Sequence, residues 1–63
     1  MNDESILNFY YYGFELNYNG QNFPMWFEHG WEKVSCLLGF NDAECGVIKE
    51  KEEILEEINR ILI

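Results

Sequence analysis

The stretch that decides the fold predicted from the sequence is ELNYNGQNFP, residues 15–24. At its centre, Asn19-Gly20 is the strongest short signal for a β-hairpin, because a type I′ turn needs a positive φ at both central residues. A two-residue loop at this point also sets the register of the two strands, so that Leu16 faces Phe23. The sequence therefore predicts an antiparallel β-hairpin centred on Asn19-Gly20.

The two faces of this hairpin carry different residues. Side chains alternate between the faces of a strand, so a first strand that begins near Ile6 has an even-numbered core face of Tyr10, Tyr12, Phe14 and Leu16. On the other face Trp26 lies across from Gly13, where an aromatic ring can cover a strand glycine. That odd-numbered face keeps an uncovered apolar surface, which consists of Leu7, Phe9, Tyr11 and Trp26.

A short helix is expected after the hairpin. Apolar residues recur at helical spacing over residues 31–38. Gly39 is placed to end this helix, because helices commonly end at a glycine in the left-handed conformation. The sequence thus predicts a helix of about two turns.

A longer helix is expected at the C-terminal end. Residues 41–44 have the spacing of a capping box, and an apolar stripe over residues 47–63 predicts an amphipathic helix. A competing interpretation makes Cys45–Lys49 a short third strand and starts the helix at Glu50. Because an isolated hairpin is marginal in water, both helices should cover its core face. The expected fold class is α+β.

The length of the chain limits it to one small domain, residues 1–63. A domain of about 60 residues buries only about 60% of the surface of its unfolded chain, so it needs large core side chains or a partner. Aromatic residues make up 17% of this sequence, and each buries about 150–250 Å². We therefore expect a domain held by aromatic packing, with disorder limited to residues 1–5.

The N-terminus and the cysteines bear on localisation. The first residues are acidic where a signal peptide is basic, and no apolar segment follows them. No stretch approaches the roughly 20 apolar residues of a membrane span. Cys36 and Cys45 are too few for a disulfide scaffold. The expected location is the cytoplasm, with both thiols reduced and no membrane partner.

Catalytic and metal-binding residues are scarce. The chain has one histidine, His29, and two cysteines, whereas a structural zinc site needs four closely spaced nitrogen or sulfur ligands. His29 and Cys36 are the only conceivable base and nucleophile, and nothing marks this thiol as activated. We expect neither an enzyme nor a site for a cofactor or metal.

The formal net charge of −8 is the strongest functional signal. Direct binding to nucleic acid depends on Lys and Arg, and this chain has only four such residues against twelve acidic ones. Nucleic acid and anionic membranes are therefore disfavoured as direct partners. A basic protein is the partner that this charge suits.

The densest part of this charge lies on the expected C-terminal helix, at Glu50, Glu52, Glu53, Glu56 and Glu57. Like-charged pairs four residues apart each destabilise a helix by roughly a few tenths of a kcal/mol. One interpretation is a solvated helix face. A second is that these carboxylates meet Lys and Arg of a partner in place of phosphates, and a third is coiled-coil pairing through the apolar stripe.

The uncovered hairpin face is a second candidate binding surface. Aromatic anchors are expected there, since Trp and Tyr concentrate binding energy at interfaces. The candidate side chains on and beside this face are Tyr11, Trp26, Phe9, Tyr18, Glu15 and Glu28. The alternative buries the aromatic residues in a homodimer or under a third strand.

The chain resembles the small acidic proteins that phages encode against host machinery. The shared features are its short length, its net charge, and the expected combination of an aromatic hairpin with an acidic helix. These phage proteins include anti-CRISPR proteins, DNA mimics and inhibitors of DNA-processing enzymes. Residues 19–39, about a third of the chain, are loosely similar in hairpin-then-helix order to a phage uracil-DNA glycosylase inhibitor. No functional residues carry over from that similarity.

The resemblance and the charge together imply a non-enzymatic inhibitor in the cytoplasm of a bacterial host. Its expected partner is a basic nucleic-acid-binding protein or nuclease, with the acidic helix supplying electrostatic attraction and Trp26 and Tyr11 supplying apolar contacts. The alternative is a homo-oligomeric interaction module in which the acidity serves only solubility.

Overall fold

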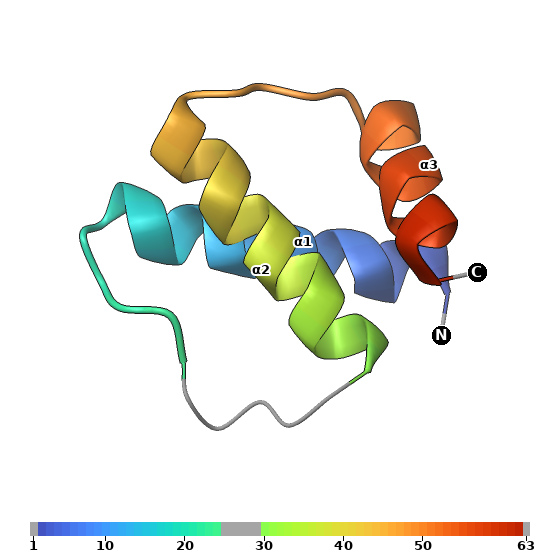
Figure 1. Cartoon of the computed structure of the whole chain (residues 1–63), viewed down its shortest axis with the longest axis horizontal. Helices are drawn as coiled ribbons and strands as arrows, with labels where there is room; N and C mark the ends of the chain where they lie inside the picture. The colour runs from blue at the N-terminus through green and yellow to red at the C-terminus, as the bar shows by residue number, and fades with distance from the viewer. Residues whose placement is uncertain (1, 25–29, 63) are drawn as a thin grey trace.

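The computed structural model describes residues 2–24 and 30–62, which form three helices (Figure 1). They are α1 (Asp3–Tyr18), α2 (Trp31–Cys45) and α3 (Lys51–Leu62). The described part of the chain contains no strand, so the fold is all-α and the predicted α+β hairpin fold is wrong. Part of the expected second strand lies outside the described residues, together with the residues after it: Met25, Trp26, Phe27, Glu28 and His29.

The start of α1 is capped by the chain itself. The side chain of Asn2 accepts a hydrogen bond of 2.8 Å from the backbone N–H of Ser5, which satisfies one of the free donors at the helix start. Asp3 and Glu4 in the first turn place negative charge at the positive end of the helix dipole. Asp3 to Ser5, for which the sequence suggests disorder, therefore form the first turn of a helix.

The Asn19-Gly20 pair ends α1 instead of turning a hairpin. Gly20 has a φ of +74°, and the N–H of Gln21 donates to the carbonyl of Leu16 at 2.9 Å, as in a Schellman cap. A hairpin turn and a helix cap both require a positive φ, so Asn-Gly by itself fits either. The predicted pairing of Leu16 with Phe23 is therefore wrong.

Burial along α1 follows the period of a helix. Ile6, Tyr10 and Gly13 are buried at intervals of four and three residues. Tyr12, which the hairpin prediction places in the core with Tyr10 and Phe14, is 41% exposed. A helix turns by about 100° per residue and so carries residues i and i+2 to different faces. The predicted even-numbered core face is therefore wrong as a set, although Tyr10 lies in the core and Phe14 packs against it.

The second helix continues through Gly39, which the sequence predicts as its end. It stops instead at Gly46, which has a φ of +70°. The N–H of Val47 donates to the carbonyl of Asp42 at 2.8 Å, so this end is also a Schellman cap. The predicted capping box at residues 41–44 consequently lies inside the helix.

Gly39 matters because α2 crosses α1 at this residue (Figure 1). A Cβ atom at Gly39 would lie 1.9 Å from the carbonyl oxygen of Tyr10, and one at Gly13 would lie 1.9 Å from the carbonyl oxygen of Cys36. Non-bonded carbon contacts are normally about 3.5–4.0 Å, so only glycine allows these backbones to touch. Ser35 and Cys36 are also fully buried on α2, so small side chains flank this close contact.

The third helix completes the core. Ile54 and Ile58 of α3 are fully buried and pack with Ile6 and Tyr10 of α1. Half-buried apolar side chains from all three helices surround this cluster, including Leu7, Phe14, Trp31, Leu38, Leu55 and Leu62. The amphipathic stripe predicted for the C-terminal helix is confirmed at its two central isoleucines.

The start of α3 differs from both sequence interpretations. Residues 47–50 are not helical, and they do not form a strand. A helix from Val47 is therefore wrong, and so is a third strand at Cys45–Lys49. The helix begins at Lys51, one residue after the start that the competing interpretation gives.

Candidate protein-binding surface

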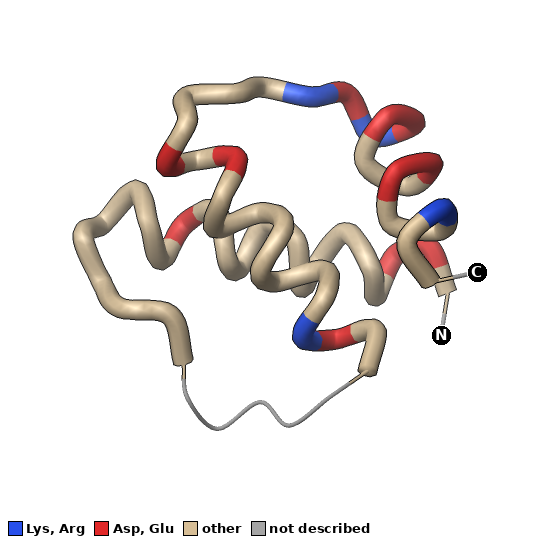
Figure 2. The backbone as a smooth tube through the Cα atoms, viewed as in Figure 1, with Lys and Arg blue, Asp and Glu red and all other residues tan. Residues whose placement is uncertain are grey.

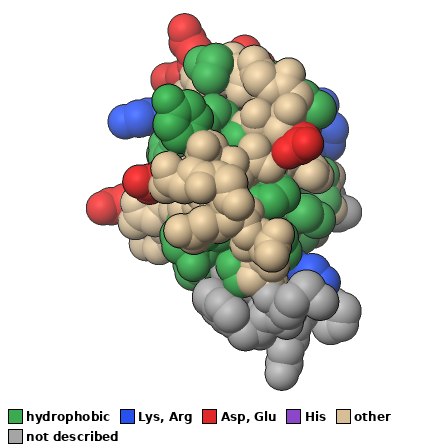
Figure 3. Space-filling view, turned by 90° about the vertical axis from the view of Figure 1, so that its left-hand side faces the viewer, with side chains coloured by type: hydrophobic (Ala, Val, Ile, Leu, Met, Phe, Trp, Pro, Cys, Tyr) green, Lys and Arg blue, Asp and Glu red, His purple; other side chains and the backbone are tan. Residues whose placement is uncertain are grey.

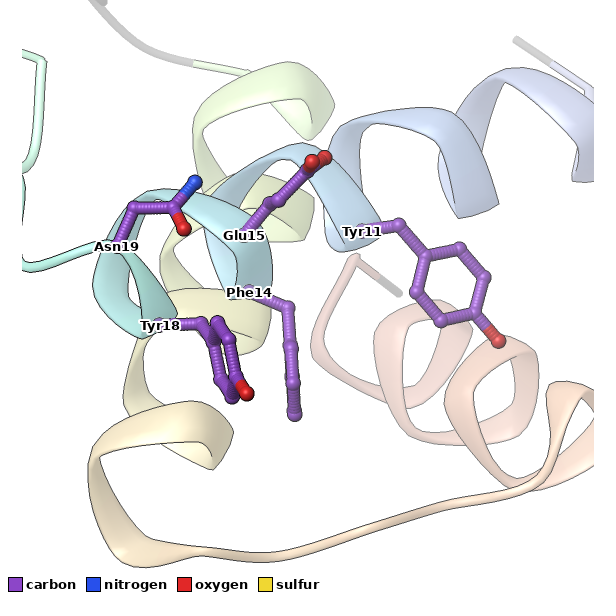
Figure 4. Close-up of a pocket in the computed structure, with 5 residues that line it drawn as sticks. All are labelled: Tyr11, Phe14, Glu15, Tyr18 and Asn19. Carbon is purple, nitrogen blue, oxygen red and sulfur yellow. The ribbon is translucent and has the colours of Figure 1, made fainter.

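A second face of α1, besides the one in the core, is open to solvent. It carries residues at positions i, i+3, i+4, i+7 and i+8, which share one side of a helix. These residues are Tyr11, Phe14, Glu15, Tyr18 and Asn19, and they line an open depression (Figure 4). In Figure 4 the rings of Phe14 and Tyr18 lie side by side, whereas Glu15 and Asn19 project along another edge of the helix.

The depression continues toward the segment between α2 and α3. A second depression shares Tyr11 and Phe14 with the first and is completed by Tyr10, Ile48 and Lys49. Ile48 is 81% exposed and Tyr18 is 80% exposed, so a large side chain is largely open to solvent at each end of the two joined depressions. We call the surface formed by Tyr11, Phe14, Tyr18 and Ile48 the tyrosine groove. Figure 3, which faces the C-terminal end of α1, shows hydrophobic side chains at the surface between polar ones.

Lys49 fixes the segment that carries Ile48. Its Nζ lies 3.0 Å from Oδ2 of Asp42 in α2 and 2.5 Å from Oε2 of Glu57 in α3. The hydroxyl of Tyr10 in α1 donates to the same Asp42 carboxylate. One polar network therefore joins all three helices, and it anchors the segment directly beside the exposed Ile48.

Burial and hydrogen bonding shift the pKa values in this network. Burial raises the pKa of the Tyr10 hydroxyl above its usual range, and the hydrogen bond to Asp42 raises it further. Burial by itself lowers the pKa of Lys49, but the hydrogen bonds to Glu57 and Asp42 outweigh it, so the net shift is upward. Both groups keep their protons at neutral pH, and Lys49 carries its positive charge.

The acidic run of the C-terminal half lies on α3 and just before it (Figure 2), and it divides into paired and unpaired members. Glu57 pairs with Lys49, and Glu56 pairs with Arg60 at 2.9 Å. Within residues 2–24 and 30–62, the exposed members without a basic partner are Glu50, Glu52 and Glu53. The unpaired charge of this acidic run therefore lies at the start of α3, where the helix dipole also favours acidic residues.

The candidate residues of the N-terminal half lie in different places. Tyr11 and Glu15 come together in the first depression, whereas Trp26 and Glu28 lie outside the described residues. Phe9 does not join the open face, because its ring packs edge-on against Trp31 with centroids 5.4 Å apart. The uncovered surface that the hairpin prediction builds from odd-numbered residues is therefore wrong, although Tyr11 does face solvent.

Two residues of the tyrosine groove are missing from the sequence-based candidates. The hairpin prediction places Phe14 in the core, and the helix prediction places Ile48 on a buried stripe. A helical reading of residues 11–18 brings Phe14 to one face with Tyr11 and Tyr18, so that signal is present in the sequence. The exposure of Ile48 has no such signal, because it depends on where α3 begins.

Metal ligands and nucleophilic side chains are the other candidate sites among the described residues. Among them, no three His, Cys, Asp or Glu side chains gather so that they could hold a metal ion. Cys36 is buried, and burial raises the pKa of its thiol, so the reactive thiolate is disfavoured. The hydroxyl of Ser35 is buried without a hydrogen-bond partner in the described structure, but a fully enclosed group is closed to a substrate.

Comparison of the chain with known protein families, curated proteins and solved structures finds no match in any of the three. In the part of the chain that the structure describes, none of the helices combines the length and the apolar character needed to cross a bilayer. The surface itself is therefore the basis for assigning a function.

Proposed function

We propose that the protein is a non-enzymatic binding module that recognises and inhibits a basic, nucleic-acid-handling protein. The observation that carries this proposal is that α1 is apolar on two faces. The face with Ile6 and Tyr10 is buried in the core, whereas the face with Tyr11 and Tyr18 is open to solvent. A helix that is apolar on more than one side is normally covered on each of them, so the open face suits a partner.

The side chains of the tyrosine groove are well suited to protein recognition. Tyrosine combines a large apolar ring with a polar hydroxyl, and it is enriched where binding energy concentrates. Ile48 adds an aliphatic contact at one end, next to the Lys49 network that anchors its segment. Binding to a surface that is already ordered loses less conformational entropy than binding to a mobile one.

Charge favours a basic protein over other partners. The chain has a net charge of −8, and the described ion pairs leave Glu15, Glu50, Glu52 and Glu53 without a cation. Such a surface repels nucleic acid and anionic lipid, and it accelerates association with a basic protein. Proteins that bind nucleic acid hold phosphates with basic residues, so an acidic protein seated on those residues would inhibit them.

The test is capture from a bacterial lysate by the immobilised protein at low and at high salt, followed by identification of the captured proteins. Two variants are compared with the wild type: Y18S/I48S, which removes both ends of the groove, and I61S, which removes an exposed isoleucine elsewhere. Because loss of interface anchors costs about 2 kcal/mol or more, we expect Y18S/I48S to capture at least about tenfold less of a basic protein. The I61S variant should capture as much as the wild type, and high salt should weaken both.

The captured protein is then purified, and its binding to nucleic acid is measured with and without the acidic chain. We expect competition between the two ligands. Capture of the same proteins by Y18S/I48S and by the wild type, with both folded by circular dichroism, would show that the groove is not the binding site. Captured proteins that are not basic, or whose nucleic-acid binding is undisturbed, would contradict the rest of the proposal.

A further inference from the structure

We propose that the tyrosine groove binds an amphipathic helix of the basic partner. Its apolar side chains would contact Tyr11, Phe14, Tyr18 and Ile48, and an arginine or lysine at the border of its apolar face would pair with Glu15. This inference rests on the proposed function and goes beyond it, because it assigns the conformation and the charge pattern of the bound segment.

The conformation follows from what lines the groove. From Tyr11 to Tyr18, α1 rises about 10 Å, which matches about two turns of a second helix. An extended peptide gains its affinity mainly from main-chain hydrogen bonds to a strand edge, and the described residues contain no strand. The residues that α1 contributes have their backbone groups within a continuous helix. What they offer to a partner is side-chain contact, which is how an amphipathic helix docks.

The charge pattern follows from the two ends of the groove. Glu15 is exposed and lines the first depression, and no basic side chain of the described structure pairs with it. At the other end the lining cation is Lys49, which Asp42 and Glu57 already neutralise. The net charge along the groove is therefore negative.

A cationic side chain fits the surroundings of Glu15. Tyr18 follows Glu15 by about one turn of α1 and lines the same depression, with its ring and the Glu15 carboxylate on different edges of the helix (Figure 4). A cation can therefore pair with the Glu15 carboxylate while its apolar stem lies along the groove. The exposed ring of Tyr18 also attracts a guanidinium group over its face, which favours arginine over lysine.

A second copy of this chain has the wrong charge for the same site. Its most amphipathic helix is α3, whose exposed positions include the acidic residues Glu52, Glu53 and Glu56. Docking α3 into the groove of another copy would bring glutamates against Glu15, between molecules that each carry a net charge of −8. Two grooves facing each other would likewise bring two acidic edges together. The basic partner is the occupant that the charge admits.

The test uses defined peptides and the full chain labelled with ¹⁵N for NMR. The probe is a helical peptide of about 18 residues that has leucines on one face, arginines along the borders of that face and alanines elsewhere. One control peptide has the same composition in scrambled order, and another has glutamate in place of arginine. We expect shift changes to concentrate on residues 11–19 and Ile48, with the probe binding at least about tenfold more tightly than either control.

Two matched variants locate the cation. Glu15→Gln removes the charge at the groove, and Glu52→Gln removes an equal charge from the exposed start of α3. An exposed ion pair changes affinity by at most about fivefold. We expect Glu15→Gln to weaken binding of the arginine probe by about three- to fivefold and Glu52→Gln to weaken it by less than about twofold.

Three results would overturn the inference: equal affinity for the scrambled peptide, shift changes centred on α3, or no binding of the probe at about 1 mM. If one of them occurs while Y18S/I48S still loses its captured protein, the proposed function stands and the helical occupant is wrong. If the probe binds in the groove but capture does not depend on the groove, the proposed function is wrong instead.

Discussion

The two helices that pack on α1 are held to it in different ways. Against α2 the contact is set by Gly13 and Gly39, whose missing side chains let the backbones touch. Against α3 the contact consists of Ile54 and Ile58 in the core, together with the charged network around Lys49. The first contact tolerates no added volume, whereas the second depends on apolar burial and on charge.

This difference shows how so short a chain builds a core from few buried side chains. A close crossing brings backbone atoms into contact, so small residues gain dispersion energy without needing a large side chain. On the α3 side each buried isoleucine contributes about 1.5–3 kcal/mol. The network then supplies hydrogen bonds to Asp42 and Tyr10, which would be costly to bury without a partner.

Gly39→Ala should force α2 away from α1, and it should cost more stability than any substitution on the α3 side. The added methyl group would lie 1.9 Å from the carbonyl oxygen of Tyr10, so the helices must separate. We expect a loss of about 3 kcal/mol in the free energy of unfolding, measured by urea denaturation. The control is Gly46→Ala, which meets open space but keeps a positive φ and should cost about 1 kcal/mol. Equal effects of the two changes would contradict the close crossing.

Lys49→Met should weaken the contact of α3 with the other helices by removing one charge from the polar network. Methionine keeps most of the stem but leaves the buried Asp42 with only the Tyr10 hydroxyl as a side-chain donor. We expect a loss of about 2 kcal/mol in urea denaturation, since a buried carboxylate deprived of a partner is destabilising. Glu56→Gln breaks an ion pair that is exposed on both sides and should cost less than about 0.5 kcal/mol. If the two variants are equally stable, the network contributes no more than a surface pair.

Alkaline titration tests the network of Tyr10 and Lys49, with a smaller expected change in stability. The pKa values of Tyr10 and Lys49 are both raised in the folded state, so folding holds both protons more tightly. Their contribution to stability is complete below the ordinary pKa values of about 10 and is lost as the pH rises above them. We expect the free energy of unfolding to fall by about 1 kcal/mol per pH unit above about pH 10. Urea denaturation at pH 9 to 11 measures this slope. The slope should be shallower in the Y10F/K49M variant, which lacks both groups. A wild-type stability that does not change over this pH range would contradict the prediction.

The predictability of each helix from the sequence depends on how its polar residues are placed. In α3 the glutamates separate the apolar positions, so the helical period is clear, and the burial of Ile54 and Ile58 was predictable. In residues 6–16 the apolar and aromatic residues follow one another closely and fit a period of 2 as well as one of 3.6. Aromatic residues also favour strands. The helical period of α1 is unclear in the sequence because a second face of the helix, which we propose to bind a partner, also carries apolar residues.

The glycines show the same ambiguity at single positions. Asn19-Gly20 requires a positive φ in a hairpin and in a helix cap alike. Gly39 follows an apolar helical segment and Gly46 follows the mostly polar residues 41–45, and a glycine at either position could end α2. The structure separates them, because Gly39 faces the backbone of Tyr10 and Gly46 faces open space.

The amino-acid sequence alone establishes the net charge, the abundance of aromatic residues and the amphipathic character of the C-terminal helix. These properties depend on composition and on local period alone. The folded chain is needed to show that Gly39 lies in a helix crossing, that Lys49 neutralises Glu57, and that Ile48 extends the open face of Tyr11 and Tyr18. Each of these results depends on contacts between different helices or segments, and a local pattern does not contain the distances between them.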